Sequence, residues 1–209
     1  MKKILVTIYI FIIYVLLIAL LITFVKVLFD SIGFDYSSFV YLISGLAKAI
    51  SAFLIMWFLV KRKTVSIKWK TKVPYLHLVL YSLAALILMV LVHFIISGKS
   101  DVNVEFDIQT LLNLIIPTII VAPLAEELIF RNGIQEILAK KFNPFFAILF
   151  ASVLFGLDHV LPLNFDWLVL VNHSISGLIL GYVYHLSKSI IVPMFVHFLF
   201  NLFLFLSII

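Results

Sequence analysis

Two adjacent carboxylates lie within an apolar stretch of this chain. Glu126 and Glu127 follow the run from Leu114 to Ala125, and Arg131 comes four residues after Glu127. An ionised side chain at the centre of a membrane helix costs about 2.5–3.5 kcal/mol, so acids kept there are candidates for a functional site. The spacing predicts an ion pair between Glu127 and Arg131 on one helix face. Glu126 then points about 100° away from that pair as a free carboxylate.

An imidazole is expected at the same depth as Glu126. In the segment from Phe155 to His159, the histidine lies about as far after the turn near Asn143 as Glu126 lies before it. Each helix rises by about 1.5 Å per residue. If two antiparallel helices are joined at this turn, the Glu126 and His159 side chains therefore lie at the same depth in the membrane. The sequence therefore predicts that an acid and an imidazole meet inside a helix bundle.

A second imidazole and an amide share a helix face near the end of the chain. His197 and Asn201 are four residues apart, so both side chains project in one direction. Peptide hydrolysis needs a base that activates water and donors at the oxygen where negative charge develops. Our hypothesis is that Glu126 takes the proton from water, His159 orients that water, and His197 and Asn201 form the oxyanion hole. Glu127 and Arg131 hold the helix and tune the local field.

Composition places these residues in a membrane. Of 209 residues, 65% are hydrophobic and 12% are charged, and the mean hydropathy is +1.26. Soluble domains carry about 25% charged residues, so an integral membrane protein is predicted. We expect an all-α, polytopic transmembrane bundle and a single membrane domain, with a three-span part over 1–100, a catalytic core over 101–209, and the active site between the last four helices. The predicted spans are 4–26, 38–60, 74–97, 108–140, 144–160, 166–187 and 189–208.

The distribution of basic residues predicts a cytoplasmic N-terminus, in what we expect to be a bacterial plasma membrane. If the N-terminus is cytoplasmic and each predicted span crosses the membrane once, all of the 15 Lys and Arg residues except Lys26, Lys48 and Lys99 lie toward the cytoplasm, with Arg131 among them. The net charge of +5 is interpreted as topology and contact with anionic lipid, not as binding of nucleic acid. Lys48 falls within a span and is interpreted as a snorkelling or packing group without a function.

Three motifs in order carry a resemblance to a known family. They are EExxxR at Glu126 to Arg131, FxxxH at Phe155 to His159 and HxxxN at His197 to Asn201. On hydrophobic helices, this set resembles the CPBP family, which comprises the CAAX prenyl endopeptidases and the bacteriocin-processing or Abi-type intramembrane proteases. The resemblance covers about the last 100 residues. It implies the same roles for these side chains and an intramembrane endopeptidase activity.

The resemblance implies a peptide or protein substrate with a membrane-associated segment, such as a bacteriocin or pheromone precursor or a lipidated C-terminus. Cleavage is expected at or near the cytoplasmic face. Glu126, His159 and His197 have the ligand types of a zinc site, and the chain has no Cys; we favour a mechanism without metal. Two alternatives stay open: a non-proteolytic scaffold for bacteriocin immunity or regulation, and a proton-coupled transporter built on the acid and His side chains.

Overall fold

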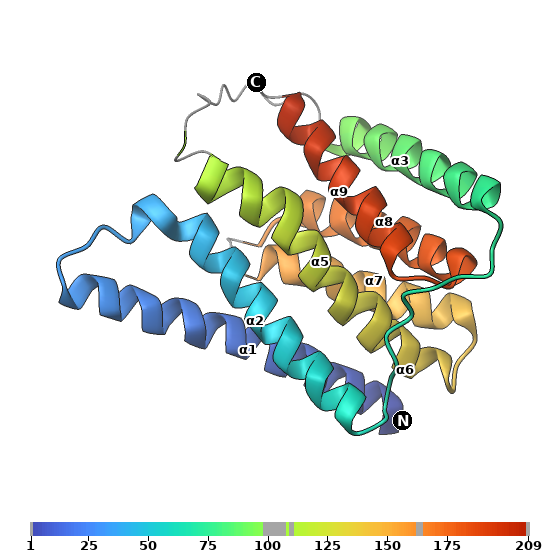
Figure 1. The fold of residues 1–209 in the computed structure, drawn as a ribbon, viewed down its shortest axis with the longest axis horizontal. Coiled ribbons are helices and arrows are strands. Elements are labelled where there is room, and N and C mark those ends of the chain that lie inside the picture. The colour runs from blue at the N-terminus through green and yellow to red at the C-terminus, as the bar shows by residue number, and fades with distance from the viewer. Residues whose placement is uncertain (1, 98–107, 109–110, 162–164, 208–209) are drawn as a thin grey trace.

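The protein is a bundle of helices, as the sequence predicts (Figure 1). The computed structural model describes residues 2–97, 108, 111–161 and 165–207, and these contain no strand. Five helical segments are long and apolar enough to cross a membrane, and two shorter apolar helices, α7 and α9, complete the set in the described residues. The helices are α1 (Lys2–Ser31), α2 (Val40–Lys61), α3 (Tyr75–Ser97), a continuous helix from Leu111 to Ala139, α7 (Pro144–Val160), α8 (Trp167–Ser187) and α9 (Ile191–Leu206), with a short 3-10 turn, η1 (Ser37–Phe39), before α2.

These helices match the seven predicted spans, and the differences are at their ends. The first span continues to Ser31 because the apolar run extends past residue 26. The last predicted span ends at 208, which lies outside the described residues, as does Lys99. Many apolar side chains on the outside of the bundle are exposed, as expected for surfaces that face lipid.

The helix that carries both glutamates changes its winding three times. Two π-helical stretches, η2 (Leu111–Val121) and η3 (Leu128–Gln135), flank the α-helical α5 (Ala122–Glu127), and α6 (Glu136–Ala139) follows. Pro117 and Pro123 lie in this helix. Proline removes an N–H donor from the helix, so neighbouring side chains must satisfy the freed carbonyl groups. π-Helical turns are rare and are found frequently at functional sites.

Three turns meet at one end of the bundle, which we call the basic end: residues 62–74, 140–143 and 188–190. The backbone N–H of Ile190 donates to the Lys68 carbonyl at 2.8 Å, and the Ser189 hydroxyl donates to the Trp69 carbonyl at 2.9 Å. The Lys140 ammonium donates to the Thr64 carbonyl. The basic end lies on the right-hand side of Figure 1. The turns predicted to lie in the cytoplasm are therefore together in space.

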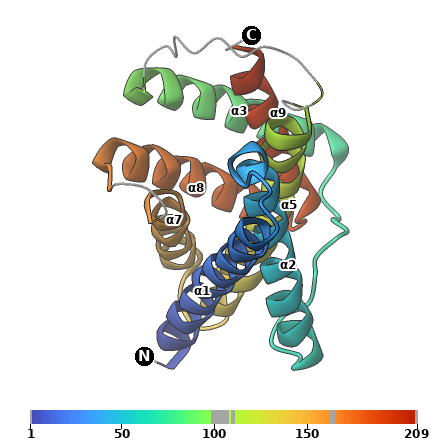
Figure 2. The same ribbon diagram turned by 90° about the vertical axis from the view of Figure 1, so that its left-hand side faces the viewer.

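Close packing of α7 against α8 fixes the position of α7, the helix that carries His159. A Cβ atom added at Gly177 on α8 would lie 3.0 Å from the Ser152 Cα atom on α7, so a larger residue would push the two helices apart by a few tenths of an ångström. Asn143 caps α7 through an acceptor bond from the Phe146 N–H at 2.8 Å, as its sequence position predicts. α3 packs on α8 and α9 at the edge of the bundle (Figure 2).

Candidate active site

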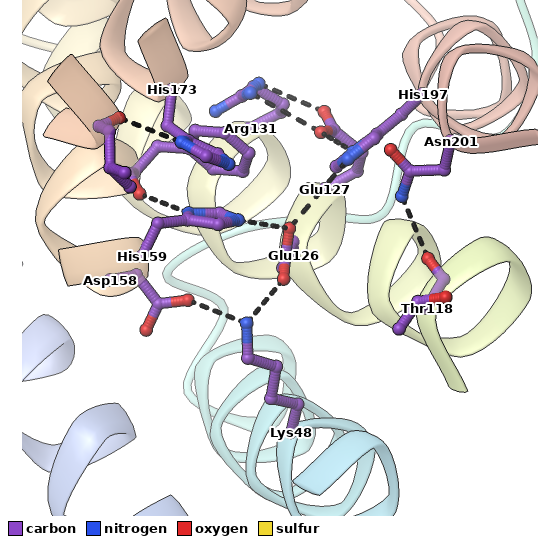
Figure 3. A network of polar contacts seen from close by, with 12 residues as sticks. Lys48, Thr118, Glu126, Glu127, Arg131, Asp158, His159, His173, His197 and Asn201 are labelled. Carbon is purple, nitrogen blue, oxygen red and sulfur yellow. Dashed lines mark hydrogen bonds and ion pairs between the residues drawn. The ribbon is translucent and has the colours of Figure 1, made fainter. Parts of the chain in front are cut away.

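The Glu126 carboxylate lies between one ammonium group and two imidazoles (Figure 3). Its Oε1 atom is 2.6 Å from Lys48 Nζ, and its Oε2 atom is 3.8 Å from His159 Nε2 and 4.0 Å from His197 Nε2. Only 2% of the Glu126 side chain is exposed. The two carboxylate oxygens therefore differ: Oε1 is held by the lysine, and Oε2 faces both histidines at distances too long for direct hydrogen bonds.

Lys48 corrects two expectations from the sequence. Its side chain does not snorkel to the membrane surface, because the ammonium contacts Glu126 and also Asp158 Oδ2, at 3.1 Å. Glu126 is therefore not a free carboxylate. A lysine inside an apolar span needs an anionic partner, and this was the signal that could have identified both contacts. The sequence does not say which acid in a distant helix supplies the partner.

The predicted ion pair between Glu127 and Arg131 is present and is completely buried. Arg131 Nε lies 3.0 Å from Glu127 Oε2, and neither side chain has any exposed area. The guanidinium also packs over the Phe155 ring at 4.8 Å, which is within the range of a cation–π contact. Arg131 was expected to lie toward the cytoplasm. Instead, its partners keep it inside the bundle, because both the carboxylate and the aromatic ring face the protein interior.

His197 links the two glutamates. Its Nδ1 atom is 3.0 Å from Glu127 Oε1, so the Nδ1 proton is donated to that carboxylate. The Nε2 atom on the other side of the ring faces Glu126. Phe155 lies beside this ring, with the two ring centroids 5.9 Å apart and the planes nearly perpendicular. The carboxylate and the phenyl ring together fix the direction of Nε2.

His159 is oriented in a similar way from α7. Its Nδ1 atom donates to the Phe155 carbonyl at 2.8 Å, which leaves Nε2 directed at Glu126. The ring of His173, from α8, stacks on His159 with a centroid distance of 3.9 Å. His173 has no role predicted from the sequence, because a histidine in an apolar helix does not show which ring it packs against.

The Asn201 side chain binds a backbone carbonyl that has no helical N–H donor, because the donor position is a proline. Its Nδ2 atom donates to the Thr118 backbone carbonyl at 2.8 Å (Figure 3). In a π-helix, the donor for that carbonyl is the N–H five residues later, and this residue is Pro123, which has none. The side-chain amide has two N–H groups, so one remains for another acceptor.

These side chains surround a cavity of about 790 Å³. This volume lies within the range of about 300–1,000 Å³ that is typical of ligand pockets. Glu126, His159, His197 and Asn201 all line it, as do Lys48 and His173. The predicted acid, imidazoles and amide therefore share one hollow. The cavity also has walls from α2 and α3, so it is not confined to the last four helices as expected.

A metal ion at Glu126 would have to share this carboxylate with Lys48. In the described residues, no three His, Asp or Glu side chains converge with the geometry of a metal site. The ammonium of Lys48 contacts Oε1 of Glu126, where a cation would compete with it. The separations of 3.8 and 4.0 Å from Oε2 to the imidazole nitrogens leave space for a bridging water.

Comparisons with known proteins show that 96 residues of the chain are similar to membrane peptidases. Residues 108–203 match the family described as Type II CAAX prenyl endopeptidase Rce1-like. Over 96 residues, the chain is 38% identical to a Bacillus subtilis (strain 168) protein described as "Putative membrane peptidase YdiL"; the match covers 46% of this chain and 37% of that protein. No solved structure matches the chain. All three motifs lie inside the matched segment.

Proposed function

We propose that this chain, whose residues 108–203 match the Type II CAAX prenyl endopeptidase Rce1-like family, is an intramembrane endopeptidase that hydrolyses peptide bonds without a metal. The observation that supports this most directly is the orientation of Glu126. One carboxylate oxygen is held by Lys48, and the other faces two imidazole nitrogens across a gap that fits one water molecule. The protein is an integral membrane protein, so its substrate has a membrane-associated or lipidated segment.

In the proposed reaction, Glu126 Oε2 accepts a proton from a water molecule in this gap. His159 orients the water, because its Nδ1 proton is donated to a backbone carbonyl and its neutral Nε2 atom is therefore an acceptor. The hydroxide forms a bond to the carbonyl carbon of the peptide, and the proton held by Glu126 then passes to the amide nitrogen as the C–N bond breaks.

Negative charge on the substrate oxygen is stabilised by His197 and Asn201. The second N–H of the Asn201 amide is available as a donor. His197 donates from Nε2 only when both of its ring nitrogens are protonated, because Nδ1 already donates to Glu127. Loss of one such donor typically lowers kcat by about 10²–10³-fold. Arg131 and Glu127 act through His197, by keeping its ring in place.

The proposal is tested with purified protein in proteoliposomes, incubated with a membrane protein extract. New peptide termini are then identified by mass spectrometry. We expect termini that depend on the protein and that lie in or beside apolar segments. An active, folded preparation of a family relative serves as the positive control. If that control produces new termini and this protein produces none, the endopeptidase proposal is wrong.

Lys48 is expected to position the base. In Lys48→Met, Glu126 loses the contact that directs Oε2 at the histidines, and Asp158 loses its partner. Because misplacement of a reacting group by about 1 Å can cost about 10²-fold, we expect kcat to fall by about that factor, with little change in KM. Steady-state kinetics on an identified substrate measure this effect.

Two variants separate positioning from general damage to α2. Lys61→Met makes the same substitution on the same helix, at its basic end, and is expected to keep wild-type kinetics. Lys48→Arg retains a cation and is expected to recover part of kcat. If Lys48→Met cleaves as fast as wild type, the positioning role is refuted.

Chelation is expected to leave cleavage unchanged, because the described residues around Glu126 do not form a metal site. The purified protein is dialysed against a strong chelator, its metal content is measured, and its rate is compared with that of untreated protein. Activity that is lost on chelation and restored by added zinc would contradict the metal-free mechanism.

A further inference from the structure

The cavity lies on one side of the bundle's midplane. Glu126 and His197 are near the middle of their helices and form its base. The other lining residues lie between this level and the end opposite the basic end. His159 is in the last turn of α7, Val169 is in the first turn of α8, and Ser207 directly follows α9. The exposed Ser207 marks the mouth of the cavity.

Packed side chains fill the bundle between this cavity and the basic end. Beyond Glu126 on the same helix, Ile129, Phe130, Arg131 and Ile134 have no exposed area. Ile190, where the chain enters α9 from the basic end, is also completely buried. A peptide therefore has no path to Glu126 from the basic end through the described residues, whereas His159 and Lys48 keep 20% and 17% of their side chains exposed on the cavity side.

The lysines at the basic end indicate on which side of the membrane the cavity opens. Lys63, Lys70, Lys72, Lys141 and Lys188 all lie in the turns of the basic end. Such lysines favour the cytoplasmic side of a membrane. The mouth of the cavity then faces the opposite compartment. The position of the mouth differs from the expectation that cleavage occurs near the cytoplasmic face. That expectation came from the sequence, which does not show on which side the cavity opens.

We infer that the site is entered from the extracytoplasmic side, and that the substrate is the exported part of a membrane-anchored polypeptide. This inference rests on the proposed function. The wall above the base is largely apolar, with Met89 and Phe94 on α3 facing Phe200, Leu204 and Phe205 on α9. The scissile bond lies beside an apolar segment, which packs against this wall while the backbone reaches Glu126.

The test uses the absence of Cys, which makes every single-Cys variant free of background. Ser207→Cys reports the mouth, Ser176→Cys reports the cavity wall on α8, and Lys141→Cys reports the basic end. Intact cells are treated with a small, charged, membrane-impermeant methanethiosulfonate. Labelling is compared before and after permeabilisation, and a Cys engineered into a known cytoplasmic protein controls for leakage.

We expect Ser207→Cys and Ser176→Cys to be labelled fully in intact cells and Lys141→Cys only after permeabilisation. The reverse pattern would overturn the inference, as would equal labelling of Ser207→Cys and Lys141→Cys before permeabilisation. Labelling of Ser207→Cys without Ser176→Cys would show that the cavity is not reached from that side. None of these outcomes depends on cleavage, so the endopeptidase proposal stands or fails separately.

Discussion

Glu126→Gln is expected to abolish peptide cleavage and leave the protein folded. The amide keeps the size of the side chain and can still accept a hydrogen bond from Lys48, but it cannot take a proton from water. General-base catalysis contributes about 10²–10⁴-fold, so the rate should fall at least that far. The measurement is the rate at which new peptide termini form in proteoliposomes, together with the thermal unfolding temperature of the purified variant.

Glu136→Gln is the matched control for that substitution. Glu136 lies on the same helix, pairs with Lys68 at 2.6 Å near the basic end, and does not line the cavity. We expect wild-type cleavage from this variant. Undiminished cleavage by Glu126→Gln would exclude Glu126 as the base, whatever the control shows.

Arg131→Met is expected to cause the largest loss of stability. Removal of the guanidinium leaves the Glu127 carboxylate buried without its cation, and breaking a buried ion pair in this way costs about 3–5 kcal/mol. The loss of packing on Phe155 adds to this cost. Unfolding of the detergent-solubilised variant, followed by heat or denaturant titration, should show a markedly lower midpoint than wild type.

The double variant Glu127→Gln with Arg131→Met tests the cause. It removes the buried charge along with its partner, and the amide oxygen introduced by Glu127→Gln would still accept from His197 Nδ1. Stability is therefore expected to recover substantially relative to Arg131→Met alone. A double variant that is as unstable as the single one would show that shape and packing, not an uncompensated charge, dominate at this site.

Short-range features of this fold could be predicted from the sequence because they depend on periodicity. The i to i+4 spacing placed Glu127 against Arg131, and equal distances from the turn near Asn143 placed His159 beside Glu126. Hydropathy located the helices because each span must be apolar over its full length. These features require only helix geometry and the position of turns.

Several contacts between helices distant in sequence were not predicted. Lys48 reaches Glu126 and Asp158 from α2, and His173 stacks on His159 from α8. Each contact depends on how helices rotate and cross, which neither hydropathy nor local spacing specifies. The Thr118 carbonyl bond to Asn201 further depends on π-helical winding before Pro123. The closure toward the basic end likewise follows only from tertiary packing.

The two alternative functions make different demands on this structure. A proton-coupled transporter needs an open path that reaches both faces in turn, and the described side chains between Glu126 and the basic end, the polar Glu127, Arg131 and Asn132 among them, are buried. Proton flux in proteoliposomes without cleavage would nevertheless favour that function. A scaffold needs only the surface of the bundle, so its cellular effect would survive Glu126→Ala.

Comparative peptidomics of cells that carry the wild-type protein or Glu126→Gln determines whether Glu126 is needed for peptide cleavage in the membrane. Peptides from membranes and from the medium are compared at equal expression of the two proteins. We predict a set of cleavage products present with wild type and absent with Glu126→Gln, accompanied by accumulation of their uncut, membrane-anchored precursors. Identical peptide profiles for the two proteins, with the precursors processed equally in both, would show that Glu126 does not catalyse peptide cleavage.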